Sequence, residues 1–191
     1  MTLRDERRFL SVTPIVFARW SVNPSCLTGG VAIEIRDLAK CPEAAADIAA
    51  WHWPEWEPGS PDGTIDGLRD MLASWTNRHG VPCIFVAFRD DAPVGSVALV
   101  AHDMEAPEPR YAGLTPWLSG LFVIPDARRR GAGSALVAVC QRRAASLGHA
   151  GLYLYTQTAE GFYQRLAWET VAEADYEGEA VTVMRRSLES S

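Results

Sequence analysis

The sequence predicts one mixed α/β domain with a short appendage in a chain of 191 residues. Strand-like stretches are interleaved with segments whose apolar residues recur at helical spacing. Most of the strand-like stretches precede the long helix-forming segment at 133–147, which indicates an antiparallel run of strands followed by a helical crossover. A chain of this length buries about 70% of its unfolded surface on folding, so neither disulfides nor a metal are needed to hold it together.

The first half of the domain is expected to contain a strand, two helices and a strand hairpin. Ser60 and Pro61 suit the N-cap and first turn of the second helix. The apolar residues of that helix recur at helical spacing, namely Ile65, Leu68, Leu72 and Trp75. A turn at Asp90-Asp91 joins the two hairpin strands. The predicted strands cover 31–36, 83–88 and 93–101, and the alanine-rich first helix covers 43–51.

The second half is expected to alternate strands with helices before a closing strand pair. The long helix at 133–147 ends at Gly148, because glycine adopts the left-handed conformation that terminates helices. A short helix is predicted at 159–166. The predicted strands cover 117–124, 151–156, 168–174 and 179–186.

Composition narrows the class of protein. Hydrophobic residues make up 48% and charged residues 22%, which is typical of a folded globular chain. No apolar run approaches the ~18 residues of a membrane-spanning helix, so we expect no membrane partner and a cytoplasmic location. The formal net charge of −6 argues against nucleic-acid binding and suits cationic small molecules.

Residues 1–30 differ from the rest of the chain. Their net charge is +2, whereas residues 31–191 carry −8. A secretory signal is disfavoured, because Asp5 and Glu6 interrupt the charged part and Pro14 interrupts the apolar part. We therefore predict an N-terminal extension of uncertain role at 1–30 and the functional domain at 31–191.

Cysteine and histidine spacing predicts no metal site. The four cysteines contain no C-x-x-C pair, and the four histidines are scattered. Reduced, mostly buried thiols are the expectation for these cysteines. Cys140 shares a helical face with Leu136, which favours packing over a role as an acyl-carrying nucleophile.

The most informative segment links a predicted strand to the long helix. It reads Leu121-Phe-Val-Ile-Pro-Asp-Ala-Arg-Arg-Arg-Gly-Ala-Gly-Ser134. Glycines let the backbone turn tightly near a ligand, and the amides at a helix start favour phosphate. Neither a Walker loop nor a dinucleotide fingerprint is present, because Leu136 replaces the third glycine of the latter. From this segment alone, a basic helix start that binds no ligand remains an alternative interpretation.

With a second block, the chain resembles the GNAT superfamily of acyl-CoA-dependent N-acetyltransferases. The first block is Val123-x-Pro125-x-x-Arg128-x-x-Gly131-x-Gly133, and the second is Phe162-Tyr163-x-x-Leu166-Ala167-Trp168. The resemblance spans 31–188, with departures at Arg129 and Ala167, where the family favours glycine. It implies a central twisted mixed sheet of about six to seven strands, flanked by about four helices and splayed at the cofactor cleft.

The resemblance also implies site residues. Tyr163 is expected to be the general acid for the departing thiolate, with a packed aromatic as the alternative. Backbone amides of the 119–123 strand are expected to hold the thioester and pantetheine, with no metal involved. The residues expected to contact acetyl-CoA are Leu121, Phe122, Val123, Arg128, Arg129, Arg130, Gly131, Ala132, Gly133, Ser134, Thr156 and Phe162.

The general base and the acceptor site are less defined. The 119–123 strand lacks the glutamate that many relatives carry, so His102, Asp103, Glu105 and Glu55 stay open as bases, and each also fits a solvated loop. The segment Trp51-His-Trp-Pro-Glu-Trp56 is expected between the first two helices, where it either roofs the acceptor or packs the core. The predicted acceptor-site residues are Trp53, Glu55, Trp56 and His102.

These features predict an N-acetyltransferase that transfers acetyl from acetyl-CoA to a primary amine, on a small molecule or a protein N-terminus. The alternative is a non-catalytic acyl-CoA sensor or regulatory module on the same fold. A pure interaction domain is a third class, and it predicts no affinity for CoA. Dimers are common in the family, which leaves a homodimer open.

Overall fold

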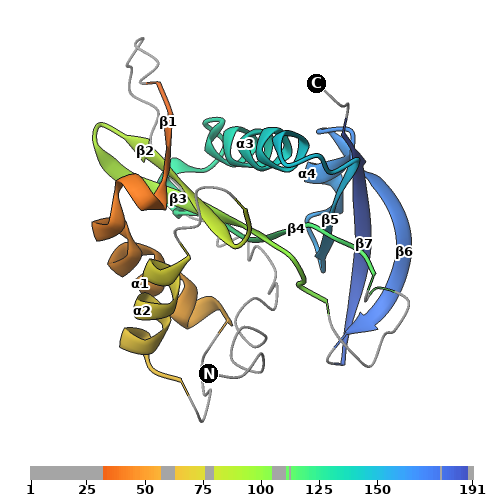
Figure 1. Cartoon of the computed structure of the whole chain (residues 1–191), viewed down its shortest axis with the longest axis horizontal. Helices are drawn as coiled ribbons and strands as arrows, with labels where there is room; N and C mark the ends of the chain where they lie inside the picture. The colour runs from red at the N-terminus through yellow and green to blue at the C-terminus, as the bar shows by residue number, and fades with distance from the viewer. Residues whose placement is uncertain are drawn as a thin grey trace.

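The computed structural model describes residues 32–56, 63–75, 80–104, 111, 113–176 and 178–188. Within these ranges the chain forms a seven-stranded mixed sheet with four α-helices, as predicted (Figure 1). The strands are β1 (Glu34–Asp37), β2 (Cys83–Arg89), β3 (Ala92–Val100), β4 (Trp117–Val123), β5 (Gly151–Thr156), β6 (Glu169–Tyr176) and β7 (Glu179–Ser187). The helices are α1 (Ala45–Trp56), α2 (Ile65–Ser74), α3 (Ala132–Ser146) and α4 (Glu160–Gln164).

Two layers of helices cover the two faces of the sheet (Figure 1). Helices α1 and α2 bury Ile48, Leu68 and Leu72 against one face. Helix α3 and the short α4 cover the other face, where Leu136 and Tyr163 join the core. Both cores consist mainly of apolar side chains, as expected when sheet faces are buried by amphipathic helices.

The strand order is β1-β2-β3-β4-β5-β7-β6. Strands β1 to β4 form an antiparallel run, and the helical crossover through α3 then places β5 parallel to β4. This confirms the predicted crossover. Strand β7 lies between β5 and β6, so the closing pair joins the sheet through its second strand.

Turns predicted from residue type have the expected backbone. Asp90 and Asp91 join β2 to β3 with φ of 52° and 59°, the left-handed pair that a two-residue hairpin turn requires. Gly148 follows α3 with φ of 85°, and its amide bonds the Ala145 carbonyl at 2.9 Å. The predicted terminator of the long helix is therefore confirmed.

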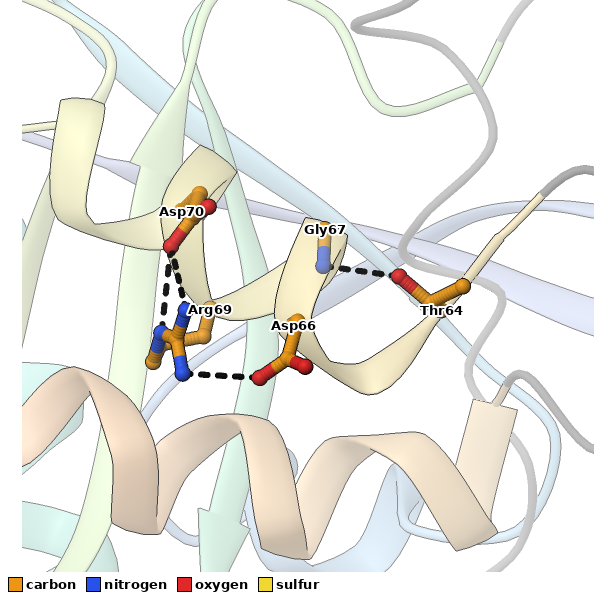
Figure 2. A network of polar contacts seen from close by, with 5 residues as sticks. All are labelled: Thr64, Asp66, Gly67, Arg69 and Asp70. Atoms are coloured by element: carbon orange, nitrogen blue, oxygen red, sulfur yellow. Dashed lines mark hydrogen bonds and ion pairs between the residues drawn. The ribbon is translucent and has the colours of Figure 1, made fainter.

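Helix α2 begins later than predicted. Its N-cap is Thr64, whose hydroxyl accepts a hydrogen bond from the Gly67 amide at 3.0 Å (Figure 2). Ser60 and Pro61 lie outside the described residues. The exposed side of the helix carries Arg69, which pairs with Asp66 at 2.7 Å and Asp70 at 2.9 Å. Of the four apolar residues at helical spacing, Leu68, Leu72 and Trp75 are buried, whereas Ile65 is 44% exposed.

The tryptophan-rich segment 51–56 is not a loop. Helix α1 continues through it to Trp56, with Pro54 in its last turn. The prediction that this segment lies between the first two helices was wrong, because the proline is accommodated within the helix. Its side chains therefore project from α1 at helical spacing.

The described cysteines are buried, and the described helices are too short or too polar to cross a membrane. Cys41, Cys83 and Cys140 are free and buried, as expected, while Cys26 lies outside the described residues. Cys140 is fully buried in the same core cluster as Leu136, which confirms the expected burial of this thiol. Among the described helices, none has the length and apolar character needed to cross a bilayer. The predicted extension at 1–30 lies outside the described residues and stays a prediction.

Candidate active site

Strands β4 and β5 separate after a single contact. Their parallel pairing has one register position, Trp117 with Tyr153, supported by a 3.0 Å bond from the Tyr153 amide to the Pro116 carbonyl. On its other side β4 stays paired with β3 as far as Val123. The edge of β4 that faces β5 is therefore not paired with β5 over residues 119–123, and backbone amides on this edge can pair with an extended ligand.

A bulge bends β4 at the start of this open edge. The register with β3 shifts between Ser96 and Ala98, so that Ser119 and Phe122 stand opposite residues only two apart. Gly120 lies within the bulge with φ of 56°. The bulge turns the strand away from β5, in agreement with the splayed cleft that the resemblance implies.

Gly95 makes the close approach of β3 and β4 possible. A Cβ atom at this position would lie 2.5 Å from the Phe122 carbonyl oxygen and 3.1 Å from the Val123 side chain. Only glycine fits such a contact with backbone. The sequence analysis missed this residue, because its constraint depends on a strand about 27 residues further along the chain.

Helix α3 begins beside the open edge. Gly131 is its N-cap, with φ of 89°, and its exposed backbone has no neighbour within 4 Å of a hypothetical Cβ. The orphan amides of the first turn follow from Ala132 onward. Gly133 lies against Phe162, whose ring would be 3.4 Å from a Cβ there. The two sequence blocks of the resemblance therefore meet in space.

The three predicted phosphate-binding arginines differ in their surroundings. The Arg128 Nε donates a 2.8 Å hydrogen bond to the Val123 carbonyl, so this side chain ties the turn to the end of β4. Arg129 and Arg130 are exposed. Arg129 has φ of 59°, the conformation that glycine favours. Arg129, which stands where the family favours glycine, therefore has a left-handed backbone conformation.

Tyr163 lies in α4, at the edge of the core beside the cleft. It is 6% exposed, and its ring packs edge-on against Trp168 at 5.8 Å and Phe162 at 5.0 Å. Burial raises the pKa of its hydroxyl above the usual value, and the nearby Cys140 and Asp103 raise the pKa further. The hydroxyl is therefore protonated at neutral pH. This side chain fits both the packed aromatic and the proton donor predicted for it.

Thr156 is at the C-terminal end of β5. It is 2% exposed, and its hydroxyl accepts a 3.1 Å hydrogen bond from the Ala159 amide. This bond closes the turn that leads into α4. The residue therefore helps to place Tyr163, and its predicted contact with acetyl-CoA stays a prediction.

Asp103 is brought to β4 by the segment that follows β3. Its Oδ1 accepts a 2.8 Å hydrogen bond from the Ser119 hydroxyl, and Ser119 is 1% exposed. Its Oδ2 is buried and accepts no hydrogen bond from the described residues. Burial raises the pKa of this carboxyl to about 8, while the Ser119 hydrogen bond lowers it. His102 is exposed, and Glu105 lies outside the described residues.

Helix α1 packs on the sheet face opposite α3 and α4, and its aromatic side chains reach β4. Trp51 stacks on Phe122 of β4 with ring centroids 5.8 Å apart and an angle of 19° between planes. Phe122, predicted as a cofactor contact through its backbone, thus directs its ring toward α1. Trp53 and Glu55 are partly buried, and the Trp56 side chain lies outside the description. Trp53 packs against the hydrophobic core, in agreement with the predicted alternative that this segment packs the core.

His52 is a buried residue that sequence reasoning did not single out. Its Nε2 lies 3.1 Å from the Ser96 hydroxyl, and its ring meets Phe122 edge-on at 6.1 Å. Burial lowers the pKa of His52 to about 3, so the ring is neutral at physiological pH. The helical spacing of α1 offered a signal, because His52 shares a face with the buried Ile48 and Ala49.

A family model described as the acetyltransferase (GNAT) family matches residues 45–168, which is more than half of the chain. The chain belongs to the GNAT family. The match includes the open edge of β4, the start of α3 and Tyr163. The GNAT chain is therefore an acyltransferase enzyme, and the mixed α/β fold agrees with that assignment.

Solved structures support the GNAT fold at low sequence identity. A GNAT-family acetyltransferase from Streptococcus pneumoniae aligns with a TM-score of 0.60 and 18% identity over 83% of this chain and 100% of its own. The polyamine N-acetyltransferase of Drosophila melanogaster gives 0.60 and 19%, over 82% and 100%. The protein yncA from Salmonella typhimurium, described with its cofactor acetyl-CoA, gives 0.60 and 17%, over 84% and 96%. No curated protein matches the chain in sequence.

The features of the GNAT site fit a CoA thioester. An extended pantetheine can pair with the open edge of β4, and a pyrophosphate suits the amides at the start of α3. Gly131 leaves the approach to those amides clear of any side-chain carbon. In the described ranges, no group of three potential ligands is arranged to hold a metal ion.

Proposed function

We propose that this GNAT enzyme transfers the acetyl group of acetyl-CoA to a primary amine, on a small molecule or a protein N-terminus, by direct attack in a ternary complex. The observation that carries the proposal is the open edge of β4. One pairing position joins β4 to β5, and the bulge at Gly120 widens the gap beyond it. The turn proposed to bind phosphate follows β4, the strand on one side of this gap, and α4 with Tyr163 follows β5, the strand on the other side.

Backbone groups supply the binding of the thioester in this proposal. The amides of β4 that point toward β5 would donate to the pantetheine chain and to the thioester carbonyl, whose oxygen gains negative charge when the amine attacks. The amides at Ala132, Gly133 and Ser134 would hold the pyrophosphate, with Arg129 and Arg130 exposed beside them. Arg128 supports this cradle through its bond to Val123.

Tyr163 is proposed to donate a hydrogen bond to the departing sulfur and then its proton. A thiol such as that of CoA has an ordinary pKa near about 8.5, so the thiolate is a moderate leaving group that hydrogen bonding assists. The raised pKa of Tyr163 keeps the donor proton in place at neutral pH. Because a phenolate in this buried position is costly, the tyrosine regains a proton within each turnover.

The acceptor is proposed to enter from the side of α1. Trp51 stacked on Phe122 offers an aromatic wall, and the partly buried Glu55 belongs to the same helix as Trp51. Aromatic faces attract alkylammonium groups, with about 0.5–2 kcal/mol for each close contact. The acidic balance of the chain also favours a cationic amine.

The test combines binding with turnover. Titration calorimetry with acetyl-CoA and desulfo-CoA measures affinity, and release of the CoA thiol in the presence of spermidine, agmatine and an aminoglycoside measures transfer. We predict that Tyr163→Phe lowers kcat by about 10²-fold while the Kd for acetyl-CoA stays within twofold. Tyr176→Phe is the matched control with unchanged kcat, because Tyr176 is a partly buried tyrosine of β6 whose ring meets Tyr155 edge-on at 5.2 Å.

Three outcomes separate the candidate functions. Tight binding with amine-dependent thiol release that Tyr163→Phe impairs supports the enzyme. Tight binding without turnover on any amine or N-terminal peptide supports the acyl-CoA sensor. An absence of binding to both CoA compounds would refute the proposed co-substrate.

A further inference from the structure

The Asp103 carboxyl is held on one side and open on the other. The Ser119 hydroxyl donates to Oδ1 at 2.8 Å. Oδ2 is buried and accepts no hydrogen bond from any described residue. A buried carboxyl oxygen without a donor costs free energy, and such an arrangement persists more readily where a ligand supplies the donor.

The position of this carboxyl relates it to the cleft. Ser119 immediately precedes the left-handed Gly120 within β4. It therefore lies where the open edge of this strand begins. The charge of Asp103 contributes to the raised pKa of Tyr163. The carboxyl and the phenol are therefore near enough to influence one another, although one follows β3 and the other belongs to α4.

We propose that Asp103 is the catalytic base that removes the proton from the attacking amine, and that Ser119 is the positioning residue that orients its carboxylate. The assignment rests on the proposed acetyl transfer and names the residue that replaces the glutamate missing from β4. Among the described residues no group donates to Oδ2, and the ammonium group of the acceptor would supply a donor. Of the other candidate bases that the structure describes, His102 is exposed and Glu55 is partly buried in α1.

The proton and electron balance of the step is complete. The Asp103 carboxylate takes one proton from the ammonium and later releases it to water. The freed nitrogen lone pair forms a bond to the thioester carbon, and the carbon–sulfur bond then breaks with its electron pair on sulfur. Tyr163 protonates that sulfur, and the second proton lost by the nitrogen restores Tyr163 through water. The products are the acetamide and the CoA thiol.

The groups around Asp103 define its titration. Burial is the largest influence on its pKa and raises it to about 8, and the Ser119 hydrogen bond from β4 opposes that change. Tyr163 of α4 is neutral at this pH, and His102, its neighbour in the chain, is exposed. Among the described residues, no cation lies close enough to shift this pKa. The carboxylate form therefore accumulates as the pH rises toward 8 and beyond.

The pH dependence of kcat/KM provides the test, because it reports the ionisation of the free enzyme. With acetyl-CoA saturating and agmatine or spermidine as the probe, wild-type kcat/KM is expected to rise with an apparent pKa near 8. We predict that Asp103→Asn lowers kcat/KM at pH 7.5 by about 10²-fold and abolishes that inflection. The deficit shrinks toward pH 10, where the amine loses its proton without help.

Ser119→Ala distinguishes a base from a structural carboxyl. Loss of the Ser119 hydrogen bond removes the influence that lowers the pKa of Asp103, so the inflection moves to higher pH. Asp103→Glu is expected to restore part of the rate. Asp47→Asn, an exposed carboxyl in the first turn of α1, is the matched control with an unchanged profile.

The outcomes separate this assignment from the proposed function. If Asp103→Asn keeps both the rate and the inflection while the wild type acetylates amines, the assignment is overturned and the acetyltransferase stands. The same holds if His102→Gln removes the inflection, or if Asp103→Asn weakens only stability and the binding of acetyl-CoA. A wild type that neither binds acetyl-CoA nor releases thiol overturns both proposals together.

Discussion

Replacing Gly95 by alanine tests whether the β3–β4 contact shapes the cofactor edge. The added Cβ would lie 2.5 Å from the Phe122 carbonyl oxygen, whereas real Cβ contacts stay beyond 3.0 Å. The obstructing atom belongs to backbone, so a rotamer change cannot relieve the overlap, and β4 itself must move. Because Phe122 and Val123 belong to the open edge, the displacement reaches the groups proposed to hold the pantetheine chain.

The size of the effect follows from the cost of overpacking. Forcing extra carbon into a filled contact costs about 1–3 kcal/mol. For a chain of this length, each kcal/mol shifts Tm by about 2–4 °C, so a decrease of roughly 2–12 °C is expected. A strand edge displaced by several tenths of an ångström is expected to weaken acetyl-CoA binding by about tenfold, or 1.4 kcal/mol.

Thermal unfolding followed by circular dichroism measures the first effect, and calorimetric titration of acetyl-CoA measures the second. Gly113→Ala is the matched control, since an added Cβ there meets nothing within 4 Å. Its Tm is expected to stay close to that of the wild type. A Gly95→Ala protein with the wild-type Tm and Kd would show that β4 tolerates the contact, and the reasoning would be refuted.

Two further predictions concern single positions in the fold. Ala167 has φ of 60°, and its left-handed backbone costs an L-residue about 1–2 kcal/mol. Ala167→Gly is therefore expected to raise the free energy of unfolding in urea by about 0.5 kcal/mol after the extra chain entropy of glycine is deducted, and a decrease would contradict this. Burial lowers the pKa of His52 from 6.5 to about 3, so below pH 6.5 the unfolded chain binds a proton that the folded chain excludes. The free energy of unfolding of the wild type thus falls as pH decreases from 6.5 toward 3. His52→Gln is expected to make this decline shallower in urea titrations at pH 7 and pH 4. An unchanged decline in the variant would contradict the prediction.

Local patterns in the sequence were sufficient for most elements. The crossover helix, its glycine terminator and the Asp90-Asp91 turn depend on residues adjacent in the chain, and the structure confirms each of them. The predicted end of the first helix at Trp51 was wrong, because α1 continues to Trp56 with the exposed Pro54 in its last turn. Thr64 was overlooked as a cap because Ser60-Pro61 offered a stronger local signal.

The candidate site was predictable where its chemistry is local and obscure where it depends on register. The turn at 128–134 combines arginine and glycine within one short segment, so its location beside a helix start follows from the sequence. The pairing of Asp103 with Ser119 requires the β3–β4 register and the bulge at Gly120. The His52–Ser96 contact likewise joins α1 to β3 across 44 positions. Composition and spacing contain no signal for either contact.

The single pairing position between β4 and β5 has a consequence for the lifetime of the protein. Two halves of the sheet, β1 to β4 and β5 to β7, share one rung, so local opening along this seam is less costly than opening within either half. A ligand that pairs with the seam stabilises the closed form by about 2.7 kcal/mol when its concentration is a hundredfold above Kd. Resistance of the chain to proteolysis in vitro is therefore expected to increase with the concentration of that ligand.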